Sequence, residues 1–290
     1  MTTIGFVGLG AMGAAIAGRL LGIAGNEVYG TNRTKAKAQP LIEQGLRWRD
    51  TPREVAAAAE VVVSMVTDDT ALAAITGGPD GIVAGLLPGH LYIDMSTVSP
   101  RASTDLAARI CAAGALMVDA PVSGSVPAAR DGSLAILVGG TDAAVEAALP
   151  VLSKLGNVSH VGENGHGLLL KLAVNISLAA QMLAFSEGVL LAERGGIDRE
   201  LAIKVMAETA IGSPMLKARA PLVLNLPEQA WFDVALMHKD IRLARDAGRQ
   251  EGVQLPSAVT ADTVLADAER AGYGHRDIAG LFEVLAKASQ

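Results

Sequence analysis

A lysine and an asparagine lie four residues apart in a strongly apolar helical stretch of the chain. At this spacing Lys171 and Asn175 share one face of a helix. An ammonium group is costly to bury unless it has partners or a chemical role. A lysine oriented by an asparagine suits the protonation of a carbonyl oxygen. The alternative is that Lys171 extends its ammonium group to solvent.

The segment DAPVSGS, residues 119–125, ends a predicted strand. Its proline, serine and glycine residues predict a turn with exposed N–H groups and hydroxyls. Such a turn, at Ser123 and Gly124, can hold a substrate carboxylate without a positive charge. The same residue types are common in ordinary turns, so the spacing leaves both interpretations open.

Two further positions carry polar groups that suit a ligand site. His238-Lys239-Asp240 lies in a helical pattern, where Lys239 can meet a cofactor or a substrate acid and Asp240 can hold a neighbouring lysine. The alternative there is a solvated charge pair. Thr97 follows a predicted strand at the edge where open α/β sheets bind ligands, although it also fits a helix-capping loop.

The first strand of the chain runs into three glycines spaced G-x-G-x-x-G. The motif consists of Gly8, Leu9, Gly10, Ala11, Met12 and Gly13. An alanine-rich helical pattern follows at once, which is the context that a dinucleotide fingerprint requires. In such a motif the first glycine permits the tight turn, the second lets the backbone approach the pyrophosphate, and the third lets the helix pack close to the strand. The N-terminus of the helix favours the negative charge of the pyrophosphate.

The end of the second predicted strand indicates which nicotinamide cofactor binds. NAD-binding units place a carboxylate there for the ribose 2′-hydroxyl. This chain instead has Asn32, Arg33 and Thr34. A guanidinium can bind a 2′-phosphate through two hydrogen bonds, so the sequence favours NADP, with NAD as the alternative. Arg33 also fits the description of an ordinary solvated residue.

These residues are positioned by two predicted domains. Short apolar runs alternate with helical patterns over the first part of the chain, which predicts a doubly wound, mostly parallel sheet. Helical patterns alone follow, so we expect an α/β Rossmann-type domain over residues 1–163 and an all-helical domain over residues 164–290. Thr51 and Ser99, each followed by proline, predict helix starts. The expected strands are Ile4–Val7, Glu27–Thr31, Val61–Val66, Leu91–Met95, Leu116–Asp119, Ala135–Val138 and Val158–Val161.

The amino-acid composition argues against several classes of ligand and binding partner. A net charge of −6 and 3% aromatic residues argue against a nucleic-acid surface. One cysteine, Cys111, excludes an internal disulfide and fits the cytoplasm. The five histidines lack metal-ligand spacing, so we expect no metal. The apolar stretch between Lys171 and Glu187 is predicted to be too short to cross a membrane.

Taken together, these motifs resemble those of the β-hydroxyacid dehydrogenase family, which includes 3-hydroxyisobutyrate dehydrogenase, tartronate semialdehyde reductase and the glyoxylate/succinic semialdehyde reductases. The resemblance covers essentially the whole chain. Its motifs occur in the family's order and spacing, at Gly8–Gly13, Asp119–Gly124, Gly165–Asn175 and Lys239-Asp240. The resemblance favours the catalytic interpretation of Lys171 and the binding interpretation of Ser123.

The resemblance implies roles for individual residues. Lys171 is similar to the family's catalytic lysine, which donates a proton to the substrate oxygen as hydride arrives from the nicotinamide. Asn175 would hold Lys171 and the substrate in place. Ser123 and the Gly124 backbone would bind the substrate carboxylate, which makes Ser123 part of the predicted catalytic group.

On the cofactor side, the resemblance implies that Lys239 closes over the site near the nicotinamide, with support from Asp240. Thr97 and the backbone of Val66 and Thr67 would contact the cofactor. Members of the family commonly dimerise or tetramerise through the helical domain, which implies a homodimer or homotetramer here.

One difference from the family's usual motif indicates which branch of the family this chain resembles. Many members have Ser-Gly-Gly where this chain has Ser123-Gly124-Ser125. This variant resembles the glyoxylate/succinic semialdehyde reductases, which tend to use NADPH. The sequence thus predicts an oxidoreductase that interconverts a small semialdehyde or oxo acid and its hydroxy acid. The alternatives are an imine reductase, whose members generally carry tyrosine or aspartate in place of Lys171, and a non-catalytic nucleotide-binding module.

Overall fold

The computed structural model describes residues 2–289, whose contacts divide into two units. The first unit extends to Lys171 and the second starts at Leu172. The division falls inside helix α9 (His166–Arg194), whereas the sequence places a boundary before this helix. The first turn of α9 belongs with the first unit because Leu168 is buried in that unit's core.

Nine strands in the described residues form one sheet, which lies in the first unit. They are β1 (Thr2–Val7), β2 (Asn26–Thr31), β3 (Arg47–Trp48), β4 (Val61–Ser64), β5 (Leu91–Asp94), β6 (Leu116–Asp119), β7 (Val122–Ser123), β8 (Leu134–Gly139) and β9 (Gly156–Gly162). Their order is β3-β2-β1-β4-β5-β6-β8-β7, with β9 beside β8. The first six strands in this order are parallel, and β8 is antiparallel to β6 and β7. The predicted Rossmann-type fold is confirmed.

Two of the strands are absent from the sequence prediction. Both β3 and β7 contain two residues, which is too short for an alternating pattern to show. They form because a neighbouring strand offers hydrogen-bond partners. In β7, for example, Ser123 pairs with Ala135 of β8. The predicted strand from Val61 ends at Ser64 rather than Val66, because the chain leaves the sheet there.

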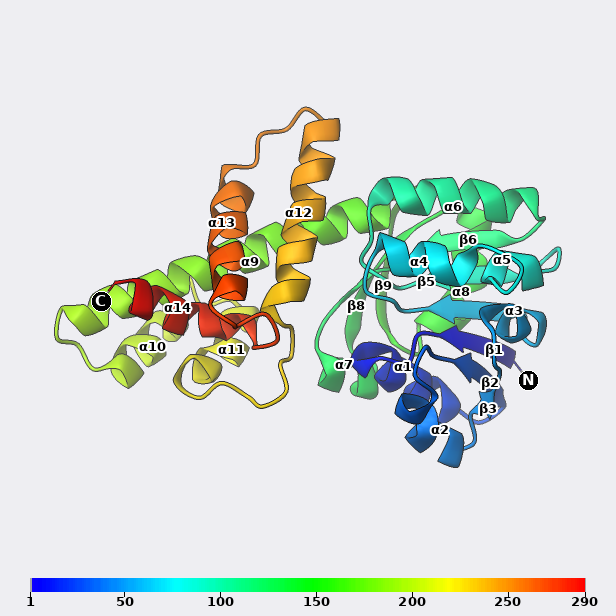
Figure 1. Ribbon diagram of the computed structural model, residues 1–290, viewed down its shortest axis with the longest axis horizontal. Coiled ribbons are helices and arrows are strands. Elements are labelled where there is room, and N and C mark those ends of the chain that lie inside the picture. Colours follow the sequence, from blue (N-terminus) through cyan, green and yellow to red (C-terminus); the bar gives the residue numbers. More distant parts are fainter. Residues whose placement is uncertain (1, 290) are drawn as a thin grey trace. The chain divides into compact units, whose positions relative to one another are not determined.

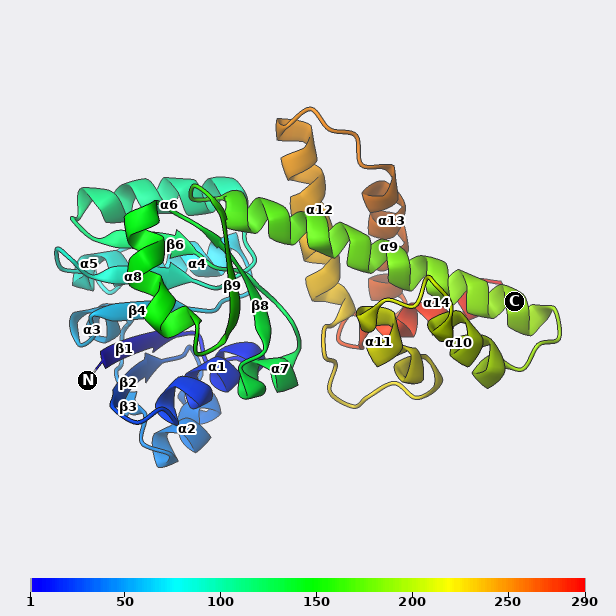
Figure 2. The same ribbon diagram turned by 180° about the vertical axis from the view of Figure 1, so that it is seen from behind.

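Helices cover both faces of the sheet (Figures 1 and 2). One face packs against α1, α7 and α8, and the other packs against α3, α4, α5 and α6. Adjacent residues of β1 point to opposite faces, Phe6 into the first core and Val7 into the second. Thr51 and Ser99 cap their helices as predicted. The helices are α1 (Ala11–Leu21), α2 (Gln39–Glu43), α3 (Pro52–Ala57), α4 (Asp69–Thr76), α5 (Ile82–Gly85), α6 (Pro100–Ala112), α7 (Val126–Asp131) and α8 (Asp142–Leu152), with a 3-10 turn at Lys35–Ala38.

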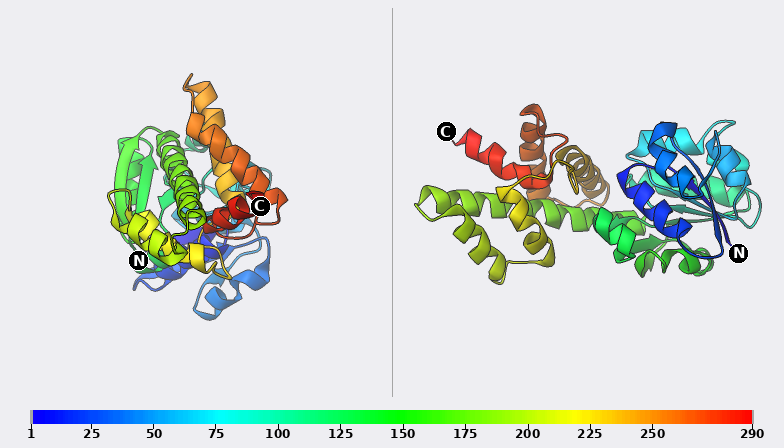
Figure 3. Two further views of the ribbon diagram at one scale, coloured as in Figure 1. Left: turned by 90° about the vertical axis from the view of Figure 1, so that its left-hand side faces the viewer. Right: turned by 90° about the horizontal axis from the view of Figure 1, so that it is seen from below.

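The second unit is helical, as predicted. Its helices beyond α9 are α10 (Arg199–Glu208), α11 (Pro214–Leu224), α12 (Val234–Gln250), α13 (Pro256–Arg270) and α14 (Leu281–Ala288), with a 3-10 turn at Ile278–Gly280. Met182 and Phe185 of α9 pack with Met237 of α12 and Leu265 of α13 in one core. Helices α12 and α13 lie side by side (Figure 3). Pro221 lies inside α11, although a proline in a helix interior lacks the N–H group for the helical hydrogen bond.

Helix α9 contains the apolar stretch between Lys171 and Glu187 and extends beyond it at both ends. It spans 29 residues, and by length and composition it is apolar enough to cross a membrane, the one such helix in residues 2–289. The apolar stretch between Lys171 and Glu187 is only the middle part of this helix, which continues past both charged residues. Within the relevant window 44% of the residues are buried in the protein itself. Core helices pass the same test, so it is weak evidence for a span.

Candidate functional site

The predicted cofactor residues follow the carboxyl ends of successive parallel strands. Gly8–Gly13 follow β1, Asn32–Thr34 follow β2, Val66–Thr67 follow β4, and Thr97 follows β5. Ser123 lies just beyond β6. Because these strands run in one direction, their carboxyl ends meet at one edge of the sheet. That edge is where open α/β sheets bind ligands.

The three glycines of the loop meet different surroundings. Gly8 has a φ of 98°, and a Cβ there would collide with the carbonyl oxygen of Met65. A Cβ on Gly13 would collide with the carbonyl oxygen of Gly8. Around a Cβ on Gly10, by contrast, the described residues place no atom within 4 Å. This open space beside the N-terminus of α1 fits a bound pyrophosphate, since a backbone without a side chain allows close approach.

Asn32 connects this loop to the end of β2. Its Oδ1 accepts a hydrogen bond from the N–H of Leu9 at 3.1 Å, and its Nδ2 donates to the carbonyl oxygen of Thr34 at 3.0 Å. Arg33, between them in sequence, is exposed. The side chain of Asn32 therefore shapes the loop, and Arg33 is exposed beside it.

The segment around Val66 is held by residues that the sequence interpretation missed. The N–H of Val66 donates to the hydroxyl of Ser96 at 2.9 Å. Asp94 Oδ1 accepts from the hydroxyls of Ser96 at 2.6 Å and Ser64 at 2.7 Å. Burial raises the pKa of Asp94 in spite of these bonds. A signal existed in the sequence, since Asp94 and Ser96 are polar residues ending an apolar strand just before Thr97.

The predicted carboxylate-binding turn begins later than expected. Val122 and Ser123 form β7, and the chain turns at Gly124, whose φ is 143°. A Cβ on Gly124 would lie 2.8 Å from the side chain of Leu134, so a larger residue meets both strain and crowding there. Ser123 is half-buried and Gly124 is exposed, which leaves both able to meet a ligand.

Lys171 and Asn175 lie one helical turn apart on the same face of α9, as their spacing predicts. Lys171 is 8% exposed and Asn175 is fully buried. The alternative in which Lys171 extends to solvent is therefore wrong. A buried ammonium needs polar partners to be stable in such a stretch.

Asp240 of α12 binds two other predicted residues of the second unit. Its Oδ2 accepts a hydrogen bond from Asn175 Nδ2 at 2.6 Å, and its Oδ1 lies 2.7 Å from Lys239 Nζ. Asp240 is 2% exposed, so Lys239 and Asp240 are not a solvated pair. His238 points to α13 instead, where its ring nitrogens lie 3.2 Å from carboxylate oxygens of Asp262 and Glu269.

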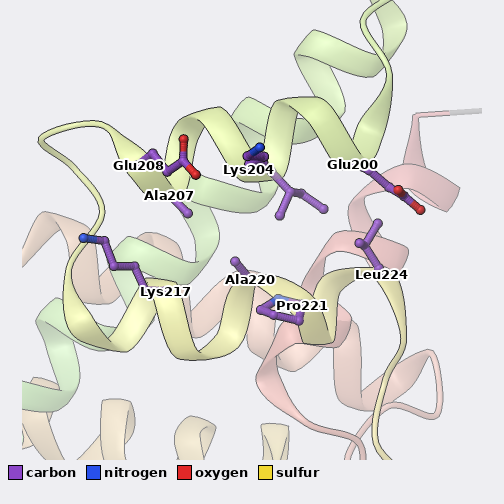
Figure 4. A pocket seen from close by; sticks show the side chains of 9 residues that line it. Glu200, Lys204, Ala207, Glu208, Lys217, Ala220, Pro221 and Leu224 are labelled. Atoms are coloured by element: carbon purple, nitrogen blue, oxygen red, sulfur yellow. The ribbon is translucent and has the colours of Figure 1, made fainter.

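The predicted residues thus form two groups, one in each unit. The first unit holds the predicted cofactor residues other than Lys239, together with Ser123, Gly124 and Lys171, and the second holds Asn175, Lys239 and Asp240. Within residues 2–289 no cluster of three histidine, cysteine, aspartate or glutamate side chains is arranged to hold a metal. A groove of about 320 Å³ lies between α10 and α11 (Figure 4), and none of the predicted site residues lines it.

Comparison with known proteins places both units in one family. The model of the NAD-binding domain of 6-phosphogluconate dehydrogenase matches residues 3–162. The model described as the NAD-binding domain of NADP-dependent 3-hydroxyisobutyrate dehydrogenase matches residues 165–285. Together these two models match nearly the whole chain.

Individual relatives agree with these models. Glyoxylate/succinic semialdehyde reductase 1 from Arabidopsis thaliana is 33% identical over 97% of this chain and 98% of its own. The structure of 3-hydroxyisobutyrate dehydrogenase from Mycobacterium tuberculosis is 30% identical, with a TM-score of 0.86 over 98% of this chain and 99% of that one. An imine reductase from Pseudomonas sp. shares the fold at 23% identity, with a TM-score of 0.64 over 98% of this chain and 99% of that one.

The sequence motifs, the fold, the relatives and the open space at the glycine loop therefore all indicate the same family of dinucleotide-binding enzymes. The chain belongs to the β-hydroxyacid dehydrogenase family, the NAD(P)-dependent oxidoreductases that act on CH–OH groups.

Proposed function

We propose that this protein is an NADP(H)-preferring reductase that converts a small semialdehyde or oxo acid into its hydroxy acid, and catalyses the reverse oxidation. One observation carries the proposal. Lys171 is a buried ammonium on α9, one turn before Asn175, whose side chain is itself held by Asp240. Such an arrangement suits a proton donor kept in one orientation.

When bound, a nicotinamide cofactor would supply hydride to the carbonyl carbon in reduction and would accept it in oxidation. The chain's own residues do the rest. Lys171 Nζ donates a proton to the carbonyl oxygen in reduction, and must be neutral to take it back in oxidation. The Ser123 hydroxyl and the Gly124 N–H bind the substrate carboxylate, and Asn175 keeps substrate and lysine aligned. Lys239, paired with Asp240, would approach the nicotinamide, as the family resemblance implies.

The preference for NADP rests on Arg33. Its guanidinium is exposed at the end of β2, beside Thr34 and after Asn32, where an NAD enzyme places a carboxylate. The matching family model of an NADP-dependent dehydrogenase supports the same choice.

The substrate class rests on the relatives. Their names include glyoxylate/succinic semialdehyde reductase and 2-(hydroxymethyl)glutarate dehydrogenase, which all indicate small acids carrying an aldehyde or alcohol. We also expect a homodimer or homotetramer, on the basis of the family resemblance.

The test is turnover of NADPH and NADH with glyoxylate, succinic semialdehyde and methylmalonate semialdehyde. We expect NADPH oxidation with at least one of them, and a decrease in kcat of about 10²- to 10⁴-fold in Lys171→Met, because the variant lacks the proton donor. Lys217→Met is the matched control, since Lys217 is exposed on α11. Turnover that is unaffected by Lys171→Met would overturn the mechanism, and cofactor binding without turnover of any aldehyde would overturn the function.

A further inference from the structure

The carboxylate of Asp119, at the end of β6, is fully buried against the start of α9. Its Oδ1 accepts a hydrogen bond from the N–H of Gly165 at 2.6 Å, and its Oδ2 accepts one from the N–H of Leu168 at 3.1 Å. The side-chain amide of Asn164 approaches Oδ1 at 3.5 Å and donates to the carbonyl oxygen of Met117 at 3.2 Å. Asp119 thus ties the end of a strand to the first turn of a helix.

This cap differs from the other helix caps of the first unit. Thr51, Asp68, Ser99 and Thr141 each cap the helix that begins at the next residue. Asp119 caps a helix that begins 47 residues later in the chain, at His166. A carboxylate there satisfies N–H groups that lack partners within the helix, and its charge matches the helix dipole. The cap therefore sets where α9 starts relative to β6.

Two glycines make room for the carboxylate. A Cβ on Gly139 would lie 2.8 Å from Asp119 Oδ2, and a Cβ on Gly167 would lie 2.7 Å from the same atom. Real side chains essentially never approach so closely. The carboxylate is consequently enclosed by β8 and α9, with little freedom to shift.

Asp119 connects the two segments that carry Ser123 and Lys171 of the predicted catalytic group. Ser123 follows it by four residues in the segment leading out of β6. Lys171 follows Leu168, whose N–H binds Asp119, by about one helical turn. Any movement of the cap changes the position of the lysine relative to the carboxylate-binding turn.

We propose that Asp119 is a positioning residue, which holds Lys171 at the correct distance from the turn of Ser123 and Gly124 by anchoring the first turn of α9. The inference rests on the proposed function of these residues. Displacing a catalytic group by about 1 Å can cost on the order of 10²-fold in rate, so an anchor of this kind has a measurable effect.

Asp119→Asn tests the inference. The amide replaces one acceptor oxygen by an NH₂ group, which opposes a backbone N–H instead of accepting from it. We expect kcat to decrease by about 10- to 100-fold, while the Kd for NADPH stays within about twofold, because the glycine loop follows a different strand. Amide hydrogen exchange of residues 165–171 should become faster, with no change in residues 8–13.

Asp198→Asn is the matched control. Asp198 also caps a helix through its carboxylate, which accepts from the N–H of Leu201 at 2.9 Å, but it lies at the start of α10 in the second unit. We expect wild-type kcat from this variant. Equal losses in both variants, wild-type kcat in Asp119→Asn, or a loss of kcat without faster exchange in residues 165–171 would each overturn the inference.

If Asp119→Asn does not fold, Asn164→Ala replaces it, because this change keeps the carboxylate and removes its third donor. We then expect smaller changes in kcat and exchange in the same direction, and no change in either would overturn the inference. Hydrogen exchange needs no substrate. Suppose that the wild type is inactive on every aldehyde but amide exchange of residues 165–171 is faster in Asp119→Asn. The proposed function has then failed, whereas the anchoring of α9 by Asp119 has not.

Discussion

The side-chain amide of Asn175 donates a 2.6 Å hydrogen bond to the carboxylate of Asp240, and both residues are buried. The other oxygen of Asp240 pairs with Lys239 Nζ at 2.7 Å. One carboxylate therefore orients an asparagine on α9 and a lysine on α12. Because an asparagine amide can rotate, this bond decides which of its groups faces away from Asp240.

Asp240→Asn should reduce activity by disturbing both partners. The variant loses the negative charge that pairs with Lys239 and one acceptor for Asn175. Loss of a charge-assisted hydrogen bond costs about 1.5–3 kcal/mol, so we expect kcat/KM to decrease by about 10- to 100-fold. Steady-state kinetics with Asp246→Asn as the control checks this, since Asp246 is exposed on the same helix. Equal kinetics in the two variants would contradict the role of Asp240.

Substitutions at two glycines of the loop should separate effects on folding from effects on NADPH binding. Gly10→Ala places a methyl group in open space, so we expect a wild-type melting temperature with a greatly increased Kd for NADPH. Gly13→Ala drives a methyl group into the carbonyl oxygen of Gly8, and overpacking of this kind costs about 1–3 kcal/mol. Thermal melts and cofactor titrations distinguish the two. Normal NADPH binding by Gly10→Ala would mean that the pyrophosphate lies elsewhere.

Arg33→Gln should change cofactor choice without affecting the fold. Loss of a guanidinium–phosphate contact of about 1.5–3 kcal/mol raises the KM for NADPH by about 10- to 100-fold. The KM for NADH, which lacks the phosphate, should stay nearly constant and serves as the internal control. Parallel changes for the two cofactors would show that Arg33 does not recognise the 2′-phosphate.

Asp119 should make the stability of the first unit depend on pH. Burial raises the pKa of Asp119 from 3.8 to about 6, although the N–H groups of Gly165 and Leu168 oppose the shift. The folded state therefore binds this proton more tightly than the unfolded state. The stabilisation from protonation is complete below about pH 4 and is lost as pH rises through about 6.

Urea titrations of wild type and Asp119→Asn at several pH values measure this contribution. The free energy of unfolding of the wild type minus that of the variant should decrease between about pH 4 and pH 6 and level off above that range. Trp48 fluorescence in a Trp231→Phe background reports on the first unit alone, because Trp48 lies in β3. A pH-independent difference would show that the folded pKa of Asp119 is close to its ordinary value.

Much of the fold was predictable because its signals are local. The first strand, the glycine motif and the caps at Thr51 and Ser99 are each encoded within a few neighbouring residues. The two-residue strand at Val122 was missed because its partner strand creates it. Local propensity alone disfavours Pro221 in a helix interior, but it lies inside α11, whose neighbouring residues Ala220 and Val223 are packed in the core.

The types and order of the chemical groups from Gly8 to Asp240, and the shared helix face of Lys171 and Asn175, follow from the sequence. Which of these groups touch one another depends on how the separate elements pack. Asn175 meets Asp240 across 65 residues of chain, and Asp119 meets Gly165 across 46. No local pattern encodes such pairs, because each forms only when the packing of separate elements buries two polar groups together and each must then satisfy the other.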